Sequence, residues 1–258
     1  MINNDIFSQV SLGIISLISN FISALSGGGA GLIQLPALLF FGLPFSKALA
    51  THKVASVALG LGASIPHLKS NKLNRKYVFL ILIAGIPGVV FGAYTASIVP
   101  TIFSSTLLGF LTLFLGFYSI NNKNLGRAKY QVEIDKLRLL FGSFGLFVIG
   151  FLNGYLSSGT GLFVTILMIT IFDLSFSDAV GYTLILVGIF WNGIGAISLG
   201  INGNIIWNYI PILILGSALG GYCGAYFSII KGSKFIKFVF EIVSISIGIS
   251  LLIKAYIS

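Results

Sequence analysis

The sequence predicts an all-α integral membrane protein built from two homologous halves. Two observations carry this prediction: the composition and an internal repeat. Of the 258 residues, 56% are hydrophobic and 8% are charged, and the mean hydropathy is +1.03, whereas soluble domains carry about 25% charged residues. The apolar runs are continuous and do not alternate with period two, so helices are favoured over a membrane β-barrel.

The repeat relates residues 21–32 (FISALSGGGAGL) to residues 151–162 (FLNGYLSSGTGL). Later in each half, Gly92-Ala93-Tyr94 matches Gly224-Ala225-Tyr226. A Gly/Ser-rich break therefore recurs at the same place in both halves. Duplicated halves with matched helix breaks are typical of transporters that bind their substrate near the middle of the bilayer.

Ten apolar runs are candidate helices. Eight of them approach the roughly 20 residues that a membrane span needs. The runs at 30–43 and 161–173, each directly after a Gly/Ser break, are shorter. They are either short spans or arms of re-entrant hairpins. We therefore expect about 8–10 helical segments, at residues 6–25, 30–43, 47–68, 77–97, 102–120, 138–156, 161–173, 178–200, 205–227 and 235–256.

The chain is predicted to form one membrane domain over residues 1–258, with a first half at about 6–120, a cytoplasmic linker at about 121–137 and a second half at about 138–256. Counting ten segments places three basic clusters on one face, which the positive-inside rule makes cytoplasmic. Five segments per half is an odd number, so the halves are expected to form an inverted-topology repeat. The clusters are Lys69, Lys72, Arg75 and Lys76; Lys123, Arg127, Lys129, Lys136 and Arg138; and Lys231, Lys234 and Lys237.

The composition and motifs also exclude several classes of protein. The sequence contains no P-loop, no HExxH motif and no paired carboxylates, so we expect neither an enzyme nor a bound cofactor. The net charge of +9 arises from the basic loops and does not indicate a nucleic-acid partner. The single cysteine, Cys223, provides neither a disulfide framework nor a Cys-based metal site.

The two Gly/Ser breaks provide the first candidate binding residues. Glycines let backbone N–H groups approach a ligand, and a helix that begins there directs its positive dipole end at an anion. Close packing of helices is the competing interpretation, but duplication of the break favours binding. The candidates are Ser26, Gly27, Gly28, Gly29, Gly31 and Gln34 in the first half, and Ser157, Ser158, Gly159, Thr160 and Gly161 in the second.

Thr51, His52 and Lys53 are the second group of candidates. Lys53 lies about 9 Å deeper along a helix than Lys47. An ionisable residue at that depth indicates a functional site, although a lysine near a helix end can also extend to the interface. A cation there complements the anion preference of the breaks. His52 is a candidate proton relay or a hydrogen-bonding residue.

The second half offers Tyr182 and Thr183 at the position of Thr51, with no basic partner. Asn153 and Asn192 lie inside apolar runs, where an amide either holds helices together or lines a path. We count Asn153, Tyr182 and Thr183 among the candidate binding residues and leave Asn192 between the two interpretations.

Other polar and small residues are assigned to the architecture. The small-residue pattern of Gly88 and Gly92, repeated at Gly220 and Gly224, predicts close helix packing. Glu241 is expected to pair with Lys237 one turn away. His67 is expected at the interface, and Asp173 and Asp178 in solvent.

The stretch SGGGAGLIQLPALLFFGLPFSKALATHKVAS resembles the signature of the TauE/SafE sulfite-exporter family of membrane permeases. In that family a Gly-rich break, a short Pro-containing helix, a Gly-x-Pro-type turn and an Ala-Thr-x-Lys element follow one another. The resemblance extends over essentially the whole chain in length and duplicated layout. The matching residues are Gly27, Gly28, Gly29, Gly31, Pro36, Gly42, Ala48, Ala50, Thr51 and Lys53, with a weaker second copy at Gly159, Gly161 and Ala179.

The resemblance implies a multi-pass carrier of the prokaryotic plasma membrane for sulfite, a sulfonate or another small organic anion. Two departures leave the substrate open: His52 replaces the more usual Asn or Ser, and the second half lacks the Pro and Lys of the first. We expect a secondary transporter that works by alternating access, with coupling to protons or sodium. The alternatives are an anion channel and a membrane scaffold or assembly protein that transports nothing. The oligomeric state is not predicted.

Overall fold

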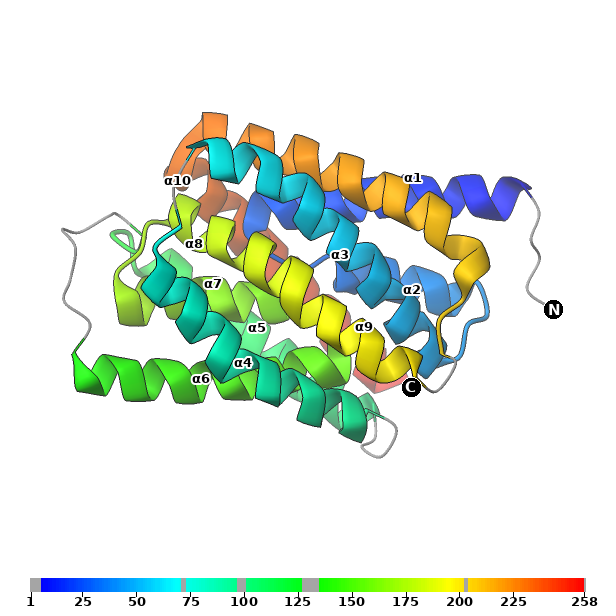
Figure 1. The fold of residues 1–258 in the computed structure, drawn as a ribbon, viewed down its shortest axis with the longest axis horizontal. Helices are drawn as coiled ribbons and strands as arrows, with labels where there is room; N and C mark the ends of the chain where they lie inside the picture. Colours follow the sequence, from blue (N-terminus) through cyan, green and yellow to red (C-terminus); the bar gives the residue numbers. More distant parts are fainter. Residues whose placement is uncertain (1–5, 71–72, 97–100, 127–134, 202–203, 258) are drawn as a thin grey trace.

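The computed structural model describes residues 6–70, 73–96, 101–126, 135–201 and 204–257, and within these ranges it is helical and contains no strand (Figure 1). The first half contains α1 (Ile6–Ser26), α2 (Gly31–Phe40), α3 (Phe45–Ser70), α4 (Arg75–Thr95) and α5 (Thr101–Asn121). The second half contains α6 (Lys136–Leu156), α7 (Thr160–Phe172), α8 (Phe176–Tyr182), the π-helical η1 (Thr183–Trp191), α9 (Asn192–Gly200), the short 3₁₀ helix η2 (Trp207–Tyr209) and α10 (Ile210–Ile257). The prediction of an all-α protein is confirmed.

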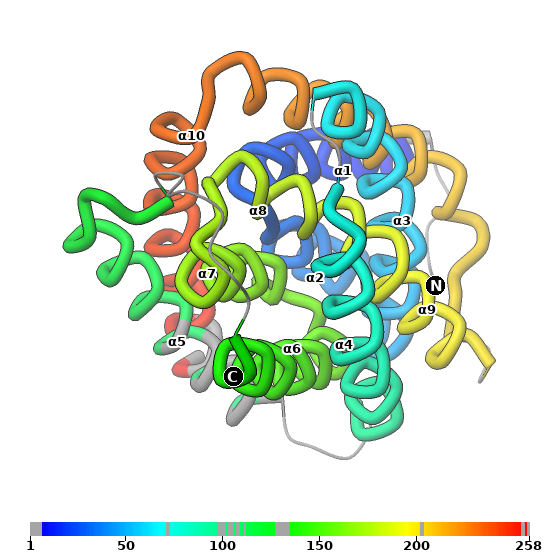
Figure 2. Tube along the Cα trace, turned by 60° about the vertical axis from the view of Figure 1, so that its left-hand side comes forward, coloured from blue at the N-terminus to red at the C-terminus, as the bar shows by residue number. Residues whose placement is uncertain are grey.

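Six helical stretches among the described residues are long and apolar enough to cross a membrane. The last of them covers Trp207–Ile253 and is 47 residues long, about 70 Å as a straight helix, which exceeds twice the roughly 30 Å of a bilayer core. Gly232, with φ 76° and ψ 178°, breaks α10, and the chain turns back there (Figure 2). Its two arms correspond to the predicted ninth and tenth segments.

The outer faces of the long helices are apolar. Ile83 on α4 is 71% exposed and Phe144 on α6 is 67% exposed. So many large apolar side chains exposed on long helices are not typical of soluble monomers and match contact with lipid. The protein is therefore a multi-pass membrane protein, as the composition predicts.

The two short helices α2 and α7 follow the two Gly/Ser breaks. They contain 10 and 13 residues, which corresponds to about 15 and 20 Å, too short to cross a bilayer core of about 30 Å. In Figure 1, α7 lies to the left of the centre and α2 to the right. Both begin near the middle of the molecule, where the two breaks contact each other.

The two halves pack closely against each other. A Cβ built at Gly92 on α4 would lie 2.0 Å from the carbonyl oxygen of Phe151 on α6. The counterpart, Gly224 on α10, packs against α1 in the same way: its Cβ would be 2.4 Å from the carbonyl oxygen of Phe21. The predicted close packing of both small-residue patterns is confirmed, and each pattern contacts the first helix of the other half.

Corresponding helices of the two halves run in opposite directions in Figure 1: α1 begins on the right and α6 on the left. The end of α3, the start of α4, the end of α5, the start of α6 and the turn at Gly232 gather at one end of the molecule. These segments carry the described members of the three basic clusters. Lys72, Arg127 and Lys129, and residues 127–134 of the predicted linker, lie outside the described residues.

Two side chains near this basic end differ from expectation. Asp173 is not simply solvated, because Arg138 Nη1 pairs with its Oδ2 at 2.7 Å and also donates to the carbonyl of Ile171. Asp178 is half-buried, and its Oδ2 accepts a hydrogen bond from Ser175 Oγ at 2.7 Å. His67 is buried among the helices and lies near Gly181 of α8. The expected pair of Lys237 and Glu241 is present, at 3.7 Å.

Candidate functional site

The two Gly/Ser breaks meet in the interior of the protein. A Cβ built at Gly28 would lie 2.7 Å from the Cα of Gly161, so the two backbones touch and no side chain fits between them. Gly28 also has φ 151°, within the range that favours glycine. Next to this contact, the Thr165 hydroxyl on α7 donates to the carbonyl of Gly27 at 3.1 Å. The breaks of the two halves thus form one junction.

A small cavity of about 40 Å³ lies at this junction. A water molecule needs about 10–15 Å³ on this measure, so the space suits a few waters or one small solute. Both halves contribute to its wall. The lining residues are Ser23, Gly28, Gly29, Ala30, Gly31, His52, Ser56, Leu59, Asn153, Ser157, Thr160, Gly161, Thr183, Leu184, Val187, Gly188 and Asn192.

The N-termini of α2 and α7 face this cavity. Neither first turn is capped by a side chain: the N-cap positions, Ala30 and Gly159, make no side-chain cap hydrogen bond. Residues of both first turns, Gly31 and Thr160 among them, line the cavity. The N–H groups of Leu32, Ile33 and Leu162 in these first turns donate to backbone carbonyls, so the preference for negative charge here comes from the positive ends of the two helix dipoles.

Lys53 is fully buried and reaches from the first half into the second. Its ammonium donates to two oxygens of Asn153, the carbonyl at 2.8 Å and Oδ1 at 3.1 Å. It lies 3.3 Å from Asn192 Oδ1 and 3.4 Å from Ser157 Oγ. Gly195 leaves room for the stem, because a Cβ there would be 2.8 Å from Lys53 Cδ. Lys53 itself does not line the cavity, but all three of its partners do.

These partners are neutral, so the Lys53 ammonium has no counter-ion in its hydrogen-bond shell. The ion pairs found between described residues join Arg138 to Asp173 and Lys237 to Glu241. Both pairs involve residues at the basic end, away from the junction. A buried charge is normally paired, and an unpaired one inside a membrane marks a functional site.

His52 lines the cavity from the first half. Its Nδ1 lies 2.8 Å from Gln34 Oε1, and its Nε2 lies 3.2 Å from Ser56 Oγ. A Cβ at Gly31 would lie only 2.9 Å from Nε2, so glycine is needed there to leave this nitrogen uncovered. Gln34 is fully buried behind His52 and does not reach the cavity.

Ser157 is the one non-glycine residue of the breaks with a positive φ, 62°, at the position that Gly27 occupies in the first half. A left-handed backbone is unfavourable for a residue with a Cβ, and such residues cluster at functional sites. The strain brings the Ser157 hydroxyl between Lys53 and Asn192, 3.4 Å from each.

The structure brings most of the predicted binding residues together, but not all of them. Thr51 turns away, and its Oγ1 accepts a hydrogen bond from the backbone N–H of Ile206 at 3.0 Å. The Tyr182 hydroxyl lies near the basic end, where the backbone N–H of Asn74 donates to it. Of the predicted residues, those outside the cavity wall are Ser26, Gly27, Gln34, Thr51, Lys53, Ser158, Gly159 and Tyr182.

Sequence reasoning missed some residues of the wall. Asn192 is the most important, since it contacts both Lys53 and Ser157. Its depth in an apolar run was a signal, but an amide there suits helix packing equally well. The structure itself gives a second indication. The π-helical η1 ends directly before Asn192, and π-helical turns often occur at functional sites.

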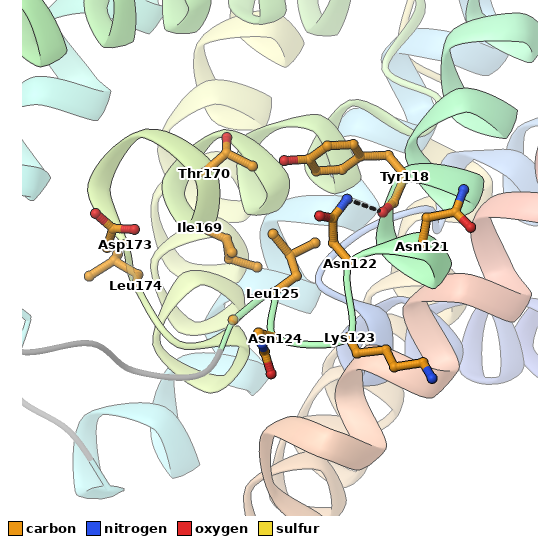
Figure 3. A pocket seen from close by; sticks show the side chains of 11 residues that line it. Tyr118, Asn121, Asn122, Lys123, Asn124, Leu125, Ile169, Thr170, Asp173 and Leu174 are labelled. Atoms are coloured by element: carbon orange, nitrogen blue, oxygen red, sulfur yellow. Dashed lines mark hydrogen bonds between the residues drawn. The ribbon is translucent and has the colours of Figure 1, made fainter.

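A larger hollow of about 490 Å³ lies at the basic end, next to the end of α5 (Figure 3). Its wall includes Asn121, Lys123, Thr170 and Asp173. The Asn122 amide donates to the carbonyl of Tyr118 at 2.8 Å. None of the predicted binding residues contributes to it, and the chain directly after Gly126 lies outside the described residues. We therefore place the candidate site at the smaller, central cavity.

Comparison with known proteins supports a membrane transporter. A "Probable membrane transporter protein" of Haemophilus influenzae is 30% identical over 227 residues, which is 86% of each chain. "Probable membrane transporter protein ORF9" of a Sinorhizobium species is 28% identical, covering 93% of this chain and 91% of its own. "Probable membrane transporter protein YfcA" of Escherichia coli is 26% identical, covering 96% and 92%. No solved structure matches the chain.

The family model described as "Sulfite exporter TauE/SafE" matches residues 12–251. The match includes both breaks, both short helices and Lys53. This is a family of membrane transporters and not of enzymes. The chain belongs to the TauE/SafE sulfite exporter family of membrane transporters.

Proposed function

We propose that this protein is a secondary carrier that moves a small anion, such as sulfite or a small sulfonate, across the plasma membrane by alternating access. The observation that carries the proposal is the environment of Lys53. Its ammonium is fully buried and donates only to neutral oxygens, and its partners line the same cavity as the N-termini of α2 and α7, which no side chain caps.

The electrostatics of this junction favour a negative solute. A cation in a low-dielectric interior is costly without a partner of opposite charge. Two helix N-termini add partial positive charge on the same side. An anion in the cavity would balance both. The contacts of Lys53 with Asn192 and Ser157 are its longest, at 3.3 and 3.4 Å, so these are the contacts that an anion would replace.

The size of the cavity restricts the solute. At about 40 Å³ it suits an ion of a few heavy atoms in the present conformation. Sulfite and the smallest sulfonates fit this restriction better than large organic anions. The description of the family as sulfite exporters favours the same class.

The arrangement of the halves supports alternating access. The cavity is shared by both halves, and corresponding helices run in opposite directions (Figure 1). We propose that the halves form an inverted-topology repeat, so that movement of one against the other would expose the junction first to one side of the membrane and then to the other.

Counterflow in liposomes tests the proposal. Purified protein is reconstituted, and uptake of radiolabelled sulfite is measured against internal sulfite, sulfonates, carboxylates and sulfate. We expect saturable exchange of at least one small anion. We also expect Lys53→Ala to raise the anion concentration at half-saturation by tenfold or more, since a charge-assisted hydrogen bond is worth about 1.5–3 kcal/mol.

Lys47→Ala is the matched control, because Lys47 lies on the same helix but is half-exposed. It should exchange like the wild type, with both variants checked for folding by size-exclusion chromatography. Unchanged affinity in folded Lys53→Ala would remove this site from the mechanism. Conductance without counterflow would indicate a channel, and no exchange of any anion would favour a scaffold.

A further inference from the structure

His52 belongs to a chain of hydrogen bonds that starts at a backbone carbonyl and ends at the cavity. Ser16 Oγ on α1 donates to the carbonyl of Leu213 at 2.9 Å. Gln34 Nε2 lies 3.0 Å from Ser16 Oγ. Gln34 Oε1 then lies 2.8 Å from His52 Nδ1. Every member of this chain is buried.

The carbonyl of Leu213 fixes the direction of the whole chain. A carbonyl can only accept, so the single hydroxyl proton of Ser16 is used there. Ser16 Oγ must then accept from Gln34, which requires the amide nitrogen of Gln34 to face Ser16. The reversed amide would set two acceptors against each other at 3.0 Å. Gln34 therefore presents its oxygen to His52.

Neighbouring groups hold Ser16 in this role. Asn20 Nδ2 donates to the Ser16 carbonyl at 2.7 Å and to Ser217 Oγ at 2.9 Å. Ser217 is then free to donate its proton to Ser16 Oγ, 2.9 Å away. This arrangement, with Gln34 and Ser217 donating to Ser16 Oγ and Ser16 donating to Leu213, gives every proton of the group an acceptor.

The consequence for His52 is a fixed tautomer. Facing the Gln34 oxygen, Nδ1 carries the proton, and Nε2 is left with a lone pair on the cavity side. Ser56 Oγ can donate to it at 3.2 Å. Gly31, with no Cβ to cover this nitrogen, keeps it accessible. A basic nitrogen thus faces the space in which an anion is proposed to bind.

The other groups around His52 supply little titrating charge. Among the residues of α1, α2, α6, α7, η1 and α9 that line the cavity, none is titratable. Lys53 follows His52 on α3, and its ammonium is directed at Asn153. The remaining titratable groups on these helices, on α8, on η2 and on α10 also do not contribute to the cavity. Those with described side chains are Lys47, His67, Lys69, Lys136, Arg138, Tyr155, Asp178, Tyr182, Tyr209, Tyr222, Cys223, Tyr226, Lys231, Lys234, Lys237, Glu241 and Tyr256.

The second half has hydroxyl groups where the first half has Gln34 and His52. Thr165 and Thr183 are separated by the same 18 residues, and Thr165 Oγ1 donates to Thr183 Oγ1 at 3.0 Å. A side-chain hydrogen bond therefore recurs in both halves, but the titratable ring among the described residues of the cavity wall belongs to the first half.

We infer that His52 binds the coupling proton of the carrier at Nε2, in the same cavity as the anion, with Gln34 as the positioning residue that fixes the ring. The inference rests on the proposed function. As the anion enters, its charge stabilises the imidazolium, so that anion and proton occupy the cavity together. The proton comes from the aqueous side to which the cavity is open, and no covalent bond changes.

Nitrogen-15 NMR of protein labelled at histidine tests the fixed tautomer directly. The chain has two histidines, so His67→Gln assigns the signals. We expect neutral His52 with its proton on Nδ1, and we expect methanesulfonate to convert it to the imidazolium. Gln34→Leu should release the tautomer without removing the ring. A proton on Nε2 in the wild type, or no response to methanesulfonate, would overturn the inference.

Transport driven by a pH gradient tests the coupling. Methanesulfonate stays ionised across the working range, so any proton movement must come from the protein. One-to-one coupling predicts about tenfold accumulation per pH unit, since a tenfold ratio and one pH unit each correspond to about 1.4 kcal/mol. His52→Asn keeps a donor for Gln34 and lacks Nε2, so the pH gradient should no longer raise its accumulation of methanesulfonate above the level reached without a gradient.

The outcomes separate the two proposals. Equal accumulation by the wild type and folded His52→Asn would show that His52 does not carry the proton, while the anion carrier would stand. Absence of exchange for every anion in the wild type would overturn the carrier itself, and the coupling with it.

Discussion

Lys53 and Asn192 show how far single residues could be predicted. A lysine so deep in an apolar run is costly and therefore indicates a functional site. The expectation that it lies near the Gly/Ser breaks agrees with its contacts to Asn153 and Ser157. Asn192 was equally compatible with packing. Its role depends on which helix it faces, and that is set by tertiary contacts which periodicity does not encode.

Thr51 and Tyr182 illustrate the opposite case. The repeat placed them at nearly equivalent positions, which favoured a shared role in binding. In the structure each hydroxyl accepts from a backbone N–H ahead of a helix of the other half, Ile206 and Asn74 respectively. Thr51 and Tyr182 therefore make equivalent contacts between the halves, although neither side chain reaches the cavity.

Ser157 gives a prediction at the residue scale. Ser157→Gly should raise the thermal stability, by about 1 kcal/mol in the free energy of unfolding, because glycine adopts a positive φ without strain. The hydrogen bonds lost are long, at 3.4 Å. The affinity of the carrier for the anion should fall, since a donor at the cavity is removed. Thermal melting in detergent and counterflow measure the two effects.

Ser157→Ala is the matched control for this prediction. It removes the same hydroxyl but keeps the Cβ at φ 62°, so it should not gain stability. Equal melting temperatures for the Gly and Ala variants would contradict the assignment of strain at this position.

At the scale of elements, the breaks and the glycine patterns were predictable because both leave local signatures. A helix cannot continue through Gly27, Gly28 and Gly29, which all have positive φ. Spaced glycines on α4 and α10 predicted close packing. The partners of that packing, α6 and α1, could not be predicted, because spacing reveals a small-residue face without revealing what covers it.

Helix packing gives a prediction at this scale. Gly92→Ala should destabilise the protein by about 3 kcal/mol, because the new Cβ would lie 2.0 Å from the carbonyl oxygen of Phe151 and the two helices would have to separate. A fall in melting temperature, measured in detergent, is the expected result.

Gly193→Ala is the same substitution at an uncrowded helical position, where the nearest atom to the Cβ would be 3.8 Å away. Here the higher helix propensity of alanine should leave stability unchanged or raise it by up to about 1 kcal/mol. Similar losses at both positions would show that α4 and α6 are not held together by this contact.

At the scale of the molecule, the composition predicted a helical membrane protein, and the repeat predicted two halves with a matched order of helices. Each of the ten predicted apolar segments corresponds to a helical stretch, with α10 divided at Gly232. The location of the basic residues at one end agrees with the expected topology, but the orientation of that end toward the cytoplasm stays a prediction. The substrate could not be predicted, since the cavity wall is assembled from residues far apart in the sequence.

The account of the whole molecule depends on one electrostatic condition: the junction of the halves holds a positive charge that only a solute can balance. Asn192→Asp changes that condition and little else. The new carboxylate is isosteric with the amide and would lie about as far from the Lys53 ammonium as the present 3.3 Å. It would act as an internal counter-ion in place of the substrate.

Counterflow by Asn192→Asp is therefore the most direct measurement, with Asn124→Asp, which adds the same charge at an exposed position, as control. We expect Asn192→Asp to fold and its rate of anion exchange to fall by tenfold or more, while Asn124→Asp exchanges like the wild type. Normal exchange by Asn192→Asp would contradict this expectation, because the anion could then not depend on the unbalanced charge of Lys53.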